Sequence, residues 1–277
     1  MFKSAINLFI SFVLMIAFSC LILLITSITL FSNDCFYLSN INDNYYSFIV
    51  QKINDGFQSV ELSSGIDSTA LNNTVTTADV KNALKVKTYN YIHNLNNGNK
   101  PLIKNDNIDK KIRITLNSYA QGNGFVLDSK TKNNIETVVA ECDSVFQNNL
   151  IQIPYFDNVI SNIKAFQTLI NTGFVVLIAI IIFLIFALIF LNLKSRNNII
   201  RYIFYGITTC GIFTGLCALL LKSTRYAYKF KFDDVIVRDT VGDIITAYFN
   251  TLIIVAFSVS IITIVLFALK SFVKEKS

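Results

Sequence analysis

The sequence predicts an all-α membrane protein with four transmembrane helices and a helical extracytoplasmic domain inserted between the first and second of them. Three observations support this fold class. Four long segments contain no charged side chain, the net charge of +6 lies in the segments on one side of them, and the chain between the first two has apolar residues at helical spacing.

The four charge-free segments are long enough to cross a bilayer. The hydrocarbon core is about 30 Å thick and requires about 20 apolar residues at about 1.5 Å each. The first apolar run continues past Cys20 to Phe31, which is longer than a signal-peptide core, so we expect an uncleaved span. The predicted parts are a first transmembrane helix in 1–33, a helical domain at 34–164 and a three-helix transmembrane region at 165–277, with spans at 165–193, 202–221 and 244–269.

The placing of charge predicts the orientation. The two termini and the connection between the second and third spans together carry seven basic residues and one acidic residue. Residues 32–164 carry 12 basic and 13 acidic residues, and residues 222–243 carry 5 and 4. Because basic residues in short loops mark the cytoplasmic face, we expect a cell-membrane protein with both termini inside and residues 34–164 outside. The basic charge reports topology, and we expect no nucleic-acid partner.

Apolar residues in the predicted outside domain recur at intervals of three and four, as in helices packed around a core. The first predicted helix covers Phe36–Phe57 and is ended by Gly56, and Glu61–Thr76 is predicted to be a loop. Thr76 lies three residues before Asp79, a spacing typical of a capping box, and predicts the start of a second helix that continues to Asn97–Gly98.

Two further helices complete the predicted domain. One is centred on Ile108–Tyr119 and stops near Gly122, and the other begins after Asp128 or Ser129. One long helix is then predicted for Tyr155–Lys194, which contains no proline. Such a helix serves either as a static support for the domain or as a lever that transmits its movement.

Cys35 and Cys142 are the two cysteines of the predicted outside domain, and the other three fall within spans. An outside location permits a disulfide. Spacing alone does not place two thiols within bonding distance. The alternatives are therefore a bond between Cys35 and Cys142 or two thiols.

The sequence offers little for catalysis. His93 is the single histidine, so a histidine-based metal cluster is excluded and a Ser–His or Cys–His pair would have to use that residue. No phosphate loop, zinc spacing or nucleophile elbow is present. The predicted spans also lack the ionisable groups typical of ion-coupled carriers. We expect no metal and no cofactor, and an enzyme is the less favoured interpretation.

The third predicted span contains three glycines, Gly206, Gly211 and Gly215. Gly211 and Gly215 form a small-xxx-small pair, which allows a second helix to approach closely. We therefore predict that this span is the packing helix. Its neighbour belongs either to the same chain, which we favour, or to a partner subunit.

The loop after the third span alternates between aromatic and mostly basic residues. As a strand it would separate the two kinds onto opposite faces. We favour an aromatic belt at the membrane surface, and the alternative is an arm that docks beneath the outside domain or binds a peptide. The residues of this candidate binding surface are Arg225, Tyr226, Tyr228, Lys229, Phe230, Lys231 and Phe232.

One span, a large outside domain and three further spans form a layout that resembles permeases of the MacB and FtsX type and lipoprotein intramolecular transacylases. The first resemblance implies a cytoplasmic ATPase partner, for which Lys194–Arg201 offers little material between the second and third spans. The second implies a helical cap with a catalytic histidine, but the residues around His93 match no such motif.

The function that the sequence favours is non-enzymatic. We expect a sensor, scaffold or accessory subunit that acts through its outside domain, lies in a lipid bilayer and has a membrane or extracytoplasmic protein partner. The alternatives are a permease-type subunit and a membrane-embedded lipid or acyl-transfer enzyme. Many Asn, Lys and Ile residues and the absence of Trp suggest a bacterial source.

Overall fold

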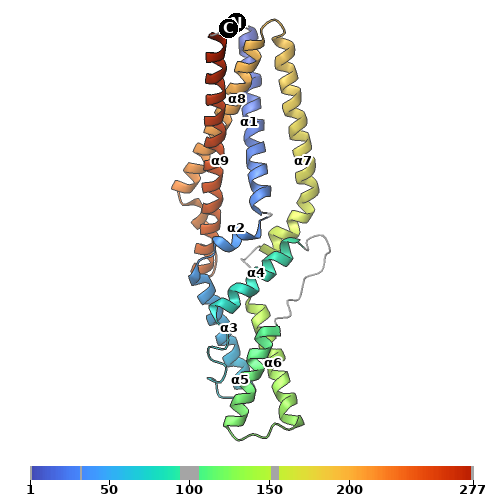
Figure 1. Ribbon diagram of the computed structural model, residues 1–277, viewed down its shortest axis with the longest axis vertical. Coiled ribbons are helices and arrows are strands. Elements are labelled where there is room, and N and C mark those ends of the chain that lie inside the picture. The colour runs from blue at the N-terminus through green and yellow to red at the C-terminus, as the bar shows by residue number, and fades with distance from the viewer. Residues whose placement is uncertain (1, 32, 94–105, 151–155, 276–277) are drawn as a thin grey trace. The chain divides into compact units, whose positions relative to one another are not determined.

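The computed structural model describes residues 2–31, 33–93, 106–150 and 156–275, and all regular structure in these ranges is helical (Figure 1). The elements are α1 (Phe2–Phe31), α2 (Asp34–Ser39), α3 (Asp43–Ser63), α4 (Thr77–His93), α5 (Asp106–Gly122), α6 (Ser129–Asn149), α7 (Phe156–Leu191), α8 (Arg196–Ser223), a short 3-10 helix η1 (Tyr226–Lys229) and α9 (Val235–Glu275).

The chain divides into two compact units. Unit 1 comprises Met1–Asn33, Asn162–Lys231 and Val241–Ser277. Unit 2 comprises Asp34–Ser161 together with the separate short segment Phe232–Thr240. Helices α7 and α9 therefore each contribute residues to both units.

Among the residues that the structure describes, four helices are long and apolar enough to cross a membrane, as predicted. They contain Lys3–Leu30, Asn171–Leu191, Asn197–Ser223 and Val235–Lys270. The last of them begins at Val235. The fourth span was predicted to begin at Ile244, because charged residues in the first turns of α9 interrupt the charge-free run.

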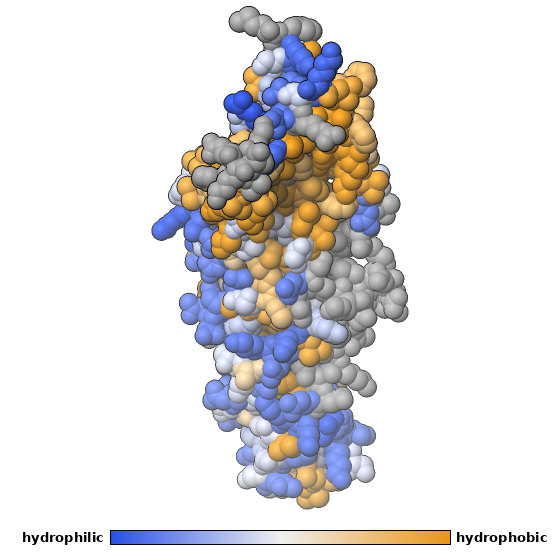
Figure 2. Space-filling view, turned by 45° about the horizontal axis from the view of Figure 1, so that its top comes forward, coloured by the Kyte–Doolittle hydropathy of each residue, from blue (hydrophilic) through white to orange (hydrophobic). Residues whose placement is uncertain are grey.

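The surface of unit 1 is apolar, as a lipid-facing surface requires. Large side chains such as Phe9, Phe183 and Phe190 are 67%, 71% and 76% exposed. Figure 2 shows a broad group of hydrophobic residues on one face of the molecule. Such an extent of exposed apolar surface is rare on soluble monomers and common on proteins with a membrane or protein partner.

Helices α1, α7 and α8 share a buried cluster that includes Ile10, Leu14 and Leu188. At one end of this cluster the Asn7 and Asn192 side chains exchange two hydrogen bonds, of 3.1 and 3.0 Å. Both amides are buried, so each satisfies the polar groups that the other would otherwise leave unpaired in an apolar environment. The pair holds α1 against the end of α7.

The glycines of α8 lie where other helices of the same chain approach most closely. A Cβ at Gly211 would lie 2.3 Å from the carbonyl oxygen of Ala256 in α9, and one at Gly215 would lie 3.0 Å from the Phe257 ring. A Cβ at Gly206 would lie 3.3 Å from Leu14 Cβ, so this glycine faces α1. Helix α8 therefore packs against α1 through one glycine and against α9 through two.

A hydrogen bond reinforces the contact between α8 and α9. The Ser260 hydroxyl donates to the carbonyl oxygen of Thr208 at 2.9 Å. A side chain on Gly211 would displace Ser260, since its Cβ would lie 2.2 Å from Ser260 Oγ. Close packing and this hydrogen bond depend on the same glycine.

Unit 2 has its own hydrophobic core between α3, α4, α5 and α6. Its largest fully buried side chains are Tyr45, Tyr46, Ile49, Ile53, Phe57, Leu71, Ile108, Ile112, Leu116, Phe146 and Leu150. Tyr45, Ile49, Ile53, Ile108, Ile112, Leu116 and Phe146 are among the residues whose helical spacing the sequence prediction used, whereas Leu71 lies in the predicted loop.

The structure corrects the predicted first helix of this unit. The chain forms two helices, because the Asn42 side chain accepts a hydrogen bond of 2.9 Å from the Tyr45 N–H and caps a new helix, α3. Gly56 does not end that helix, which continues to Ser63. A Cβ at Gly56 would lie 2.4 Å from Val145 Cγ1, so this glycine instead allows α3 to approach α6.

Two predicted helix starts are confirmed. The Thr76 hydroxyl accepts from the Asp79 N–H at 3.3 Å, and Asp79 Oδ2 accepts from the Thr76 N–H at 3.0 Å, which is the reciprocal pattern of a capping box. The Asp128 carboxylate caps α6 by accepting from the Thr131 N–H at 2.8 Å. The predicted end of α4 at Asn97–Gly98 lies outside the described residues.

The packing of α8 gives a matched pair of substitutions. Gly211→Ala should separate α8 from α9 and destabilise the protein by about 1–3 kcal/mol, as overpacking does. Gly173→Ala in α7 introduces a Cβ with no described atom within 4 Å and should be neutral or slightly stabilising. The measurement is the temperature at which each variant in mild detergent loses its gel-filtration peak. Equal temperatures for Gly211→Ala and the wild type would contradict the packing described here.

Candidate functional site

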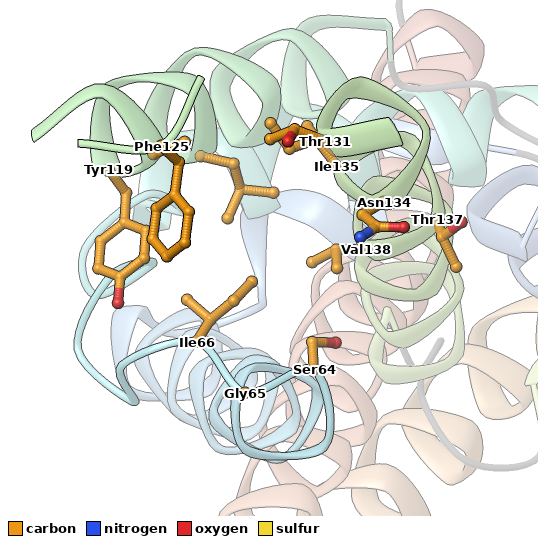
Figure 3. Close-up of a pocket in the computed structure, with 12 residues that line it drawn as sticks. Ser64, Gly65, Ile66, Tyr119, Phe125, Thr131, Asn134, Ile135, Thr137 and Val138 are labelled. Carbon is orange, nitrogen blue, oxygen red and sulfur yellow. The ribbon is translucent and has the colours of Figure 1, made fainter. Parts of the chain in front are cut away.

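A cavity of about 500 Å³ opens on unit 2 where the end of α3 meets α5 and α6 (Figure 3). Its floor consists of core side chains, Leu116 and Ala120 from α5 and Ile135 and Val138 from α6, which are all at most 8% exposed. Because core packing fixes these side chains, the floor is rigid and apolar.

The C-terminal ends of α5 and α3, which have the same backbone geometry, form two walls of the cavity. At the end of α5, Gly124 has a φ of +75° and the Phe125 N–H donates to the Ala120 carbonyl at 2.9 Å. At the end of α3, Gly65 has a φ of +69° and the Ile66 N–H donates to the Glu61 carbonyl at 2.9 Å. Both are Schellman motifs, in which a glycine in the left-handed conformation reverses the chain.

The residue after each of these glycines lines the cavity. In a Schellman motif that residue usually makes a hydrophobic contact with the preceding helix. Here the residues are Ile66 and Phe125, and both lie at the cavity. Phe125 is 60% exposed, so its ring remains available for a further contact.

Tyr119 stands beside Phe125 on the aromatic side of the cavity (Figure 3). Its hydroxyl oxygen accepts a hydrogen bond of 3.1 Å from the Asp67 N–H. This bond holds the segment after α3 against α5. Because the oxygen acts as an acceptor in it, the hydroxyl proton can be donated to another group.

The opposite side of the cavity comes from α6 and is polar. Figure 3 shows Asn134 across from the two aromatic rings. The Thr137 hydroxyl is 3.1 Å from the carbonyl oxygen of Asn133, to which it donates. The Asn134 side chain is exposed and forms no hydrogen bond among the residues that the structure describes. Its amide can therefore both donate and accept.

A buried carboxyl group fixes the segment between α3 and α4. Glu61 is 1% exposed and accepts a hydrogen bond from the Leu71 N–H. Burial raises the pKa of Glu61, the nearby Asp67 charge raises it further, and the Leu71 hydrogen bond opposes the rise. The segment after Ser63 is a loop, as its Ser, Thr and Asn content predicted, and Leu71 and Val75 are buried within it.

The ion pair of Asp79 and Lys111 joins α4 to α5, with Lys111 Nζ 2.7 Å from Asp79 Oδ1. Burial alone would raise the pKa of Asp79. The hydrogen bonds from Lys111 and Thr76 outweigh burial, so the pKa is lowered. The two carboxyl groups, Glu61 and Asp79, are therefore shifted in opposite directions.

The predicted surface at 225–232 does not form a strand. Arg225 has a φ of +50°, and Tyr226–Lys229 form the 3-10 helix η1, so the alternation of residue types does not correspond to two faces. The Tyr228 hydroxyl donates to Asp243 Oδ1 at 2.7 Å, and its ring lies over Gly242. This part of the predicted surface binds the start of α9.

Phe232 belongs to unit 2 instead. It lies in Phe232–Thr240, whose Val237 is 7% exposed within the core of that unit. Phe232 and Ile236 pack against the same core. Asp234 Oδ2 in this segment is 3.2 Å from Lys52 Nζ in α3. The segment after the third candidate span is thus part of the folded unit 2.

The structure contains no disulfide between Cys35 and Cys142, and the alternative of two thiols applies. Cys142 is fully buried in α6, whereas Cys35 is exposed on α2. Burial raises the pKa of the Cys142 thiol to about 12, with the charges of Glu61 and Glu141 adding to the rise. Cys142 is therefore a core residue and a poor nucleophile. The side chain of His93 lies outside the described residues.

No protein-family model matches the chain, and neither a curated protein nor a solved structure is found to match it. The function is therefore inferred from the residues and geometry of the site itself. No group of three or more potential metal-ligating side chains occurs in the part of the chain that the structure describes.

The sequence prediction did not include the cavity. The signal that could have indicated its walls is a pair of glycines that each precede a large apolar residue, Gly65–Ile66 and Gly124–Phe125. Each pair follows an amphipathic helix and predicts a Schellman end. That the two ends face one cavity depends on the tertiary packing of α3, α5 and α6.

The opposite pKa shifts predict opposite pH dependences. Glu61 has a raised pKa, so its contribution to stability is present at low pH and is lost as pH rises through the folded-state pKa. Glu61→Gln keeps a side-chain oxygen for the Leu71 N–H without the charge. The variant should therefore gain stability relative to the wild type as pH rises from about 4.5 to about 7.5.

Asp79→Asn is the matched control. Asp79 has a lowered pKa, so its contribution is present at neutral pH and is lost as pH falls. The variant should be less stable than the wild type near pH 7, with a difference that shrinks towards low pH. Thermal unfolding of the full chain in mild detergent across this pH range measures both effects. A pH-independent difference for Glu61→Gln would show that Glu61 does not have a raised pKa.

Proposed function

We propose that this chain is a non-enzymatic sensor or accessory subunit of the cell membrane, whose unit 2 lies outside and binds a ligand. The cavity between α3, α5 and α6 carries the proposal. Its described lining contains no acid, base or nucleophile in a catalytic arrangement, and it combines a rigid apolar floor with a few polar groups. That combination is typical of small-molecule binding sites.

The charge distribution supports the outside location. The basic excess lies at the two termini and between the second and third candidate spans, whereas the unit 2 residues between the first two spans are nearly neutral overall. The positive-inside rule then assigns the termini to the cytoplasm and unit 2 to the opposite side. The exposed apolar side chains of unit 1 would contact lipid.

The continuity of α9 supports a role in sensing. This single helix contributes Val235–Thr240 to unit 2, where Val237 is in the core, and its residues from Val241 onwards to unit 1. In the proposed function, a ligand that changes the packing of unit 2 acts on a helix that continues into the membrane. The spans would pass this change to a membrane partner.

Cys35 and an engineered cysteine provide a test of the orientation. Cys35 is exposed in unit 2 and should react with a membrane-impermeant maleimide in intact cells. In a Cys35→Ser background, Ser195→Cys in the connection between α7 and α8 should react only after the cells are permeabilised. Labelling of Ser195→Cys in intact cells, with Cys35 protected, would reverse the proposed topology.

A further inference from the structure

We propose that the cavity of unit 2 binds an uncharged small molecule that has a flat apolar ring and a hydrogen-bonding edge. This inference rests on the proposed function in one respect, namely that unit 2 is a binding unit. The volume of about 500 Å³ lies within the range of roughly 300–1,000 Å³ that small-molecule pockets occupy.

The absence of charge in the described lining excludes ions as the best ligands. None of the lining residues is Asp, Glu, Lys, Arg or His. On α5, Arg113 is already paired with Glu136 on α6, with Nε–Oε1 and Nη2–Oε2 distances of 2.7 and 2.8 Å. A charged ligand would lose its hydration without gaining a counter-ion.

The helix ends also disfavour an anion. Helices α3 and α5 both present their C-terminal ends to the cavity through Gly65 and Phe125. A helix C-terminus carries a partial negative charge of about half an elementary charge. The nearby N-terminus of α6, which would attract an anion, is already capped by the Asp128 carboxylate.

The ring and the polar edge of the ligand follow from the two walls. Tyr119 and Phe125 lie on one side, and an aromatic or flat cyclic group can stack on or pack edge-to-face with them. Asn134 lies on the other side with an amide free to donate and accept. An uncharged ligand with an amide, carbonyl or hydroxyl group complements this set.

A small molecule fits the cavity better than a protein surface does. Stable protein interfaces usually bury at least about 1,200 Å² and have a broad apolar centre. Here the buried apolar floor is confined to four side chains of α5 and α6 at the base of a hollow. At the edge of the hollow, Phe125 is the one large apolar side chain of the described lining that is more than half exposed.

Three probes with one ring system and different charges test the ligand class. Indole-3-acetamide is uncharged, indole-3-acetate is an anion and tryptamine is a cation at neutral pH. Binding to the full chain in lipid nanodiscs is measured by saturation-transfer NMR and titration calorimetry. The uncharged amide should bind at least about 10-fold more tightly than the anion, a difference of about 1.4 kcal/mol, and more tightly than the cation.

Two adjacent substitutions locate the binding site. Phe125→Ala removes a ring from the cavity wall and should weaken amide binding about 10-fold, whereas Val126→Ala changes an exposed side chain that does not line the cavity and should leave binding unchanged. Asn134→Leu removes the amide group from the polar side of the cavity and should also weaken binding of the amide probe. The variants should keep the wild-type gel-filtration profile.

Several results would overturn the proposal. Tightest binding by either charged probe would contradict the uncharged class, and equal effects of Phe125→Ala and Val126→Ala would place the ligand elsewhere. The absence of a binding signal from all three probes would contradict the proposal that the cavity is a binding site for such molecules. Because the labelling of Cys35 and Ser195→Cys does not depend on a ligand, these failures are distinguishable from failure of the proposed topology.

Discussion

The burial of Val237 in the core of unit 2 is the contact on which the rest of the structure depends. Val237 follows the third candidate span in the sequence, yet it is 7% exposed within a core formed mainly by Asp34–Ser161. Phe232 and Ile236 support it, and the pair of Lys52 with Asp234 fixes the start of the segment. An exposed ion pair contributes little, so apolar burial supplies most of the attachment.

The two units use small residues for different purposes. In unit 1, Gly211 allows α8 to contact α9 at a distance that any side chain would prevent, and the amide pair of Asn7 and Asn192 satisfies polar groups in an apolar environment. In unit 2, Gly65 and Gly124 adopt left-handed conformations that end α3 and α5 beside one cavity. The glycine of unit 1 is required for close helix packing, whereas the two glycines of unit 2 are required to reverse the chain.

The sequence predicted the all-helical class, the four apolar helices and two capped helix starts, because hydrophobic spacing and capping are local properties. It did not predict that α9 begins at Val235, since Arg238 and Asp243 interrupt the charge-free run. The alternation at 225–232 would suit a strand but did not require one, and Tyr226–Lys229 instead form a 3-10 helix that follows a left-handed residue. The cavity could not be predicted, since it requires the packing of three helix ends.

Hydrogen–deuterium exchange of the full chain in nanodiscs tests most directly whether Phe232–Thr240 is part of unit 2. Val237→Ala removes buried apolar volume, so the account predicts faster exchange in peptides of α3. Ile254→Ala changes a side chain of the same helix that is 66% exposed, and it should leave α3 unaffected. Unchanged exchange of α3 in Val237→Ala, or an equal increase in both variants, would contradict the account.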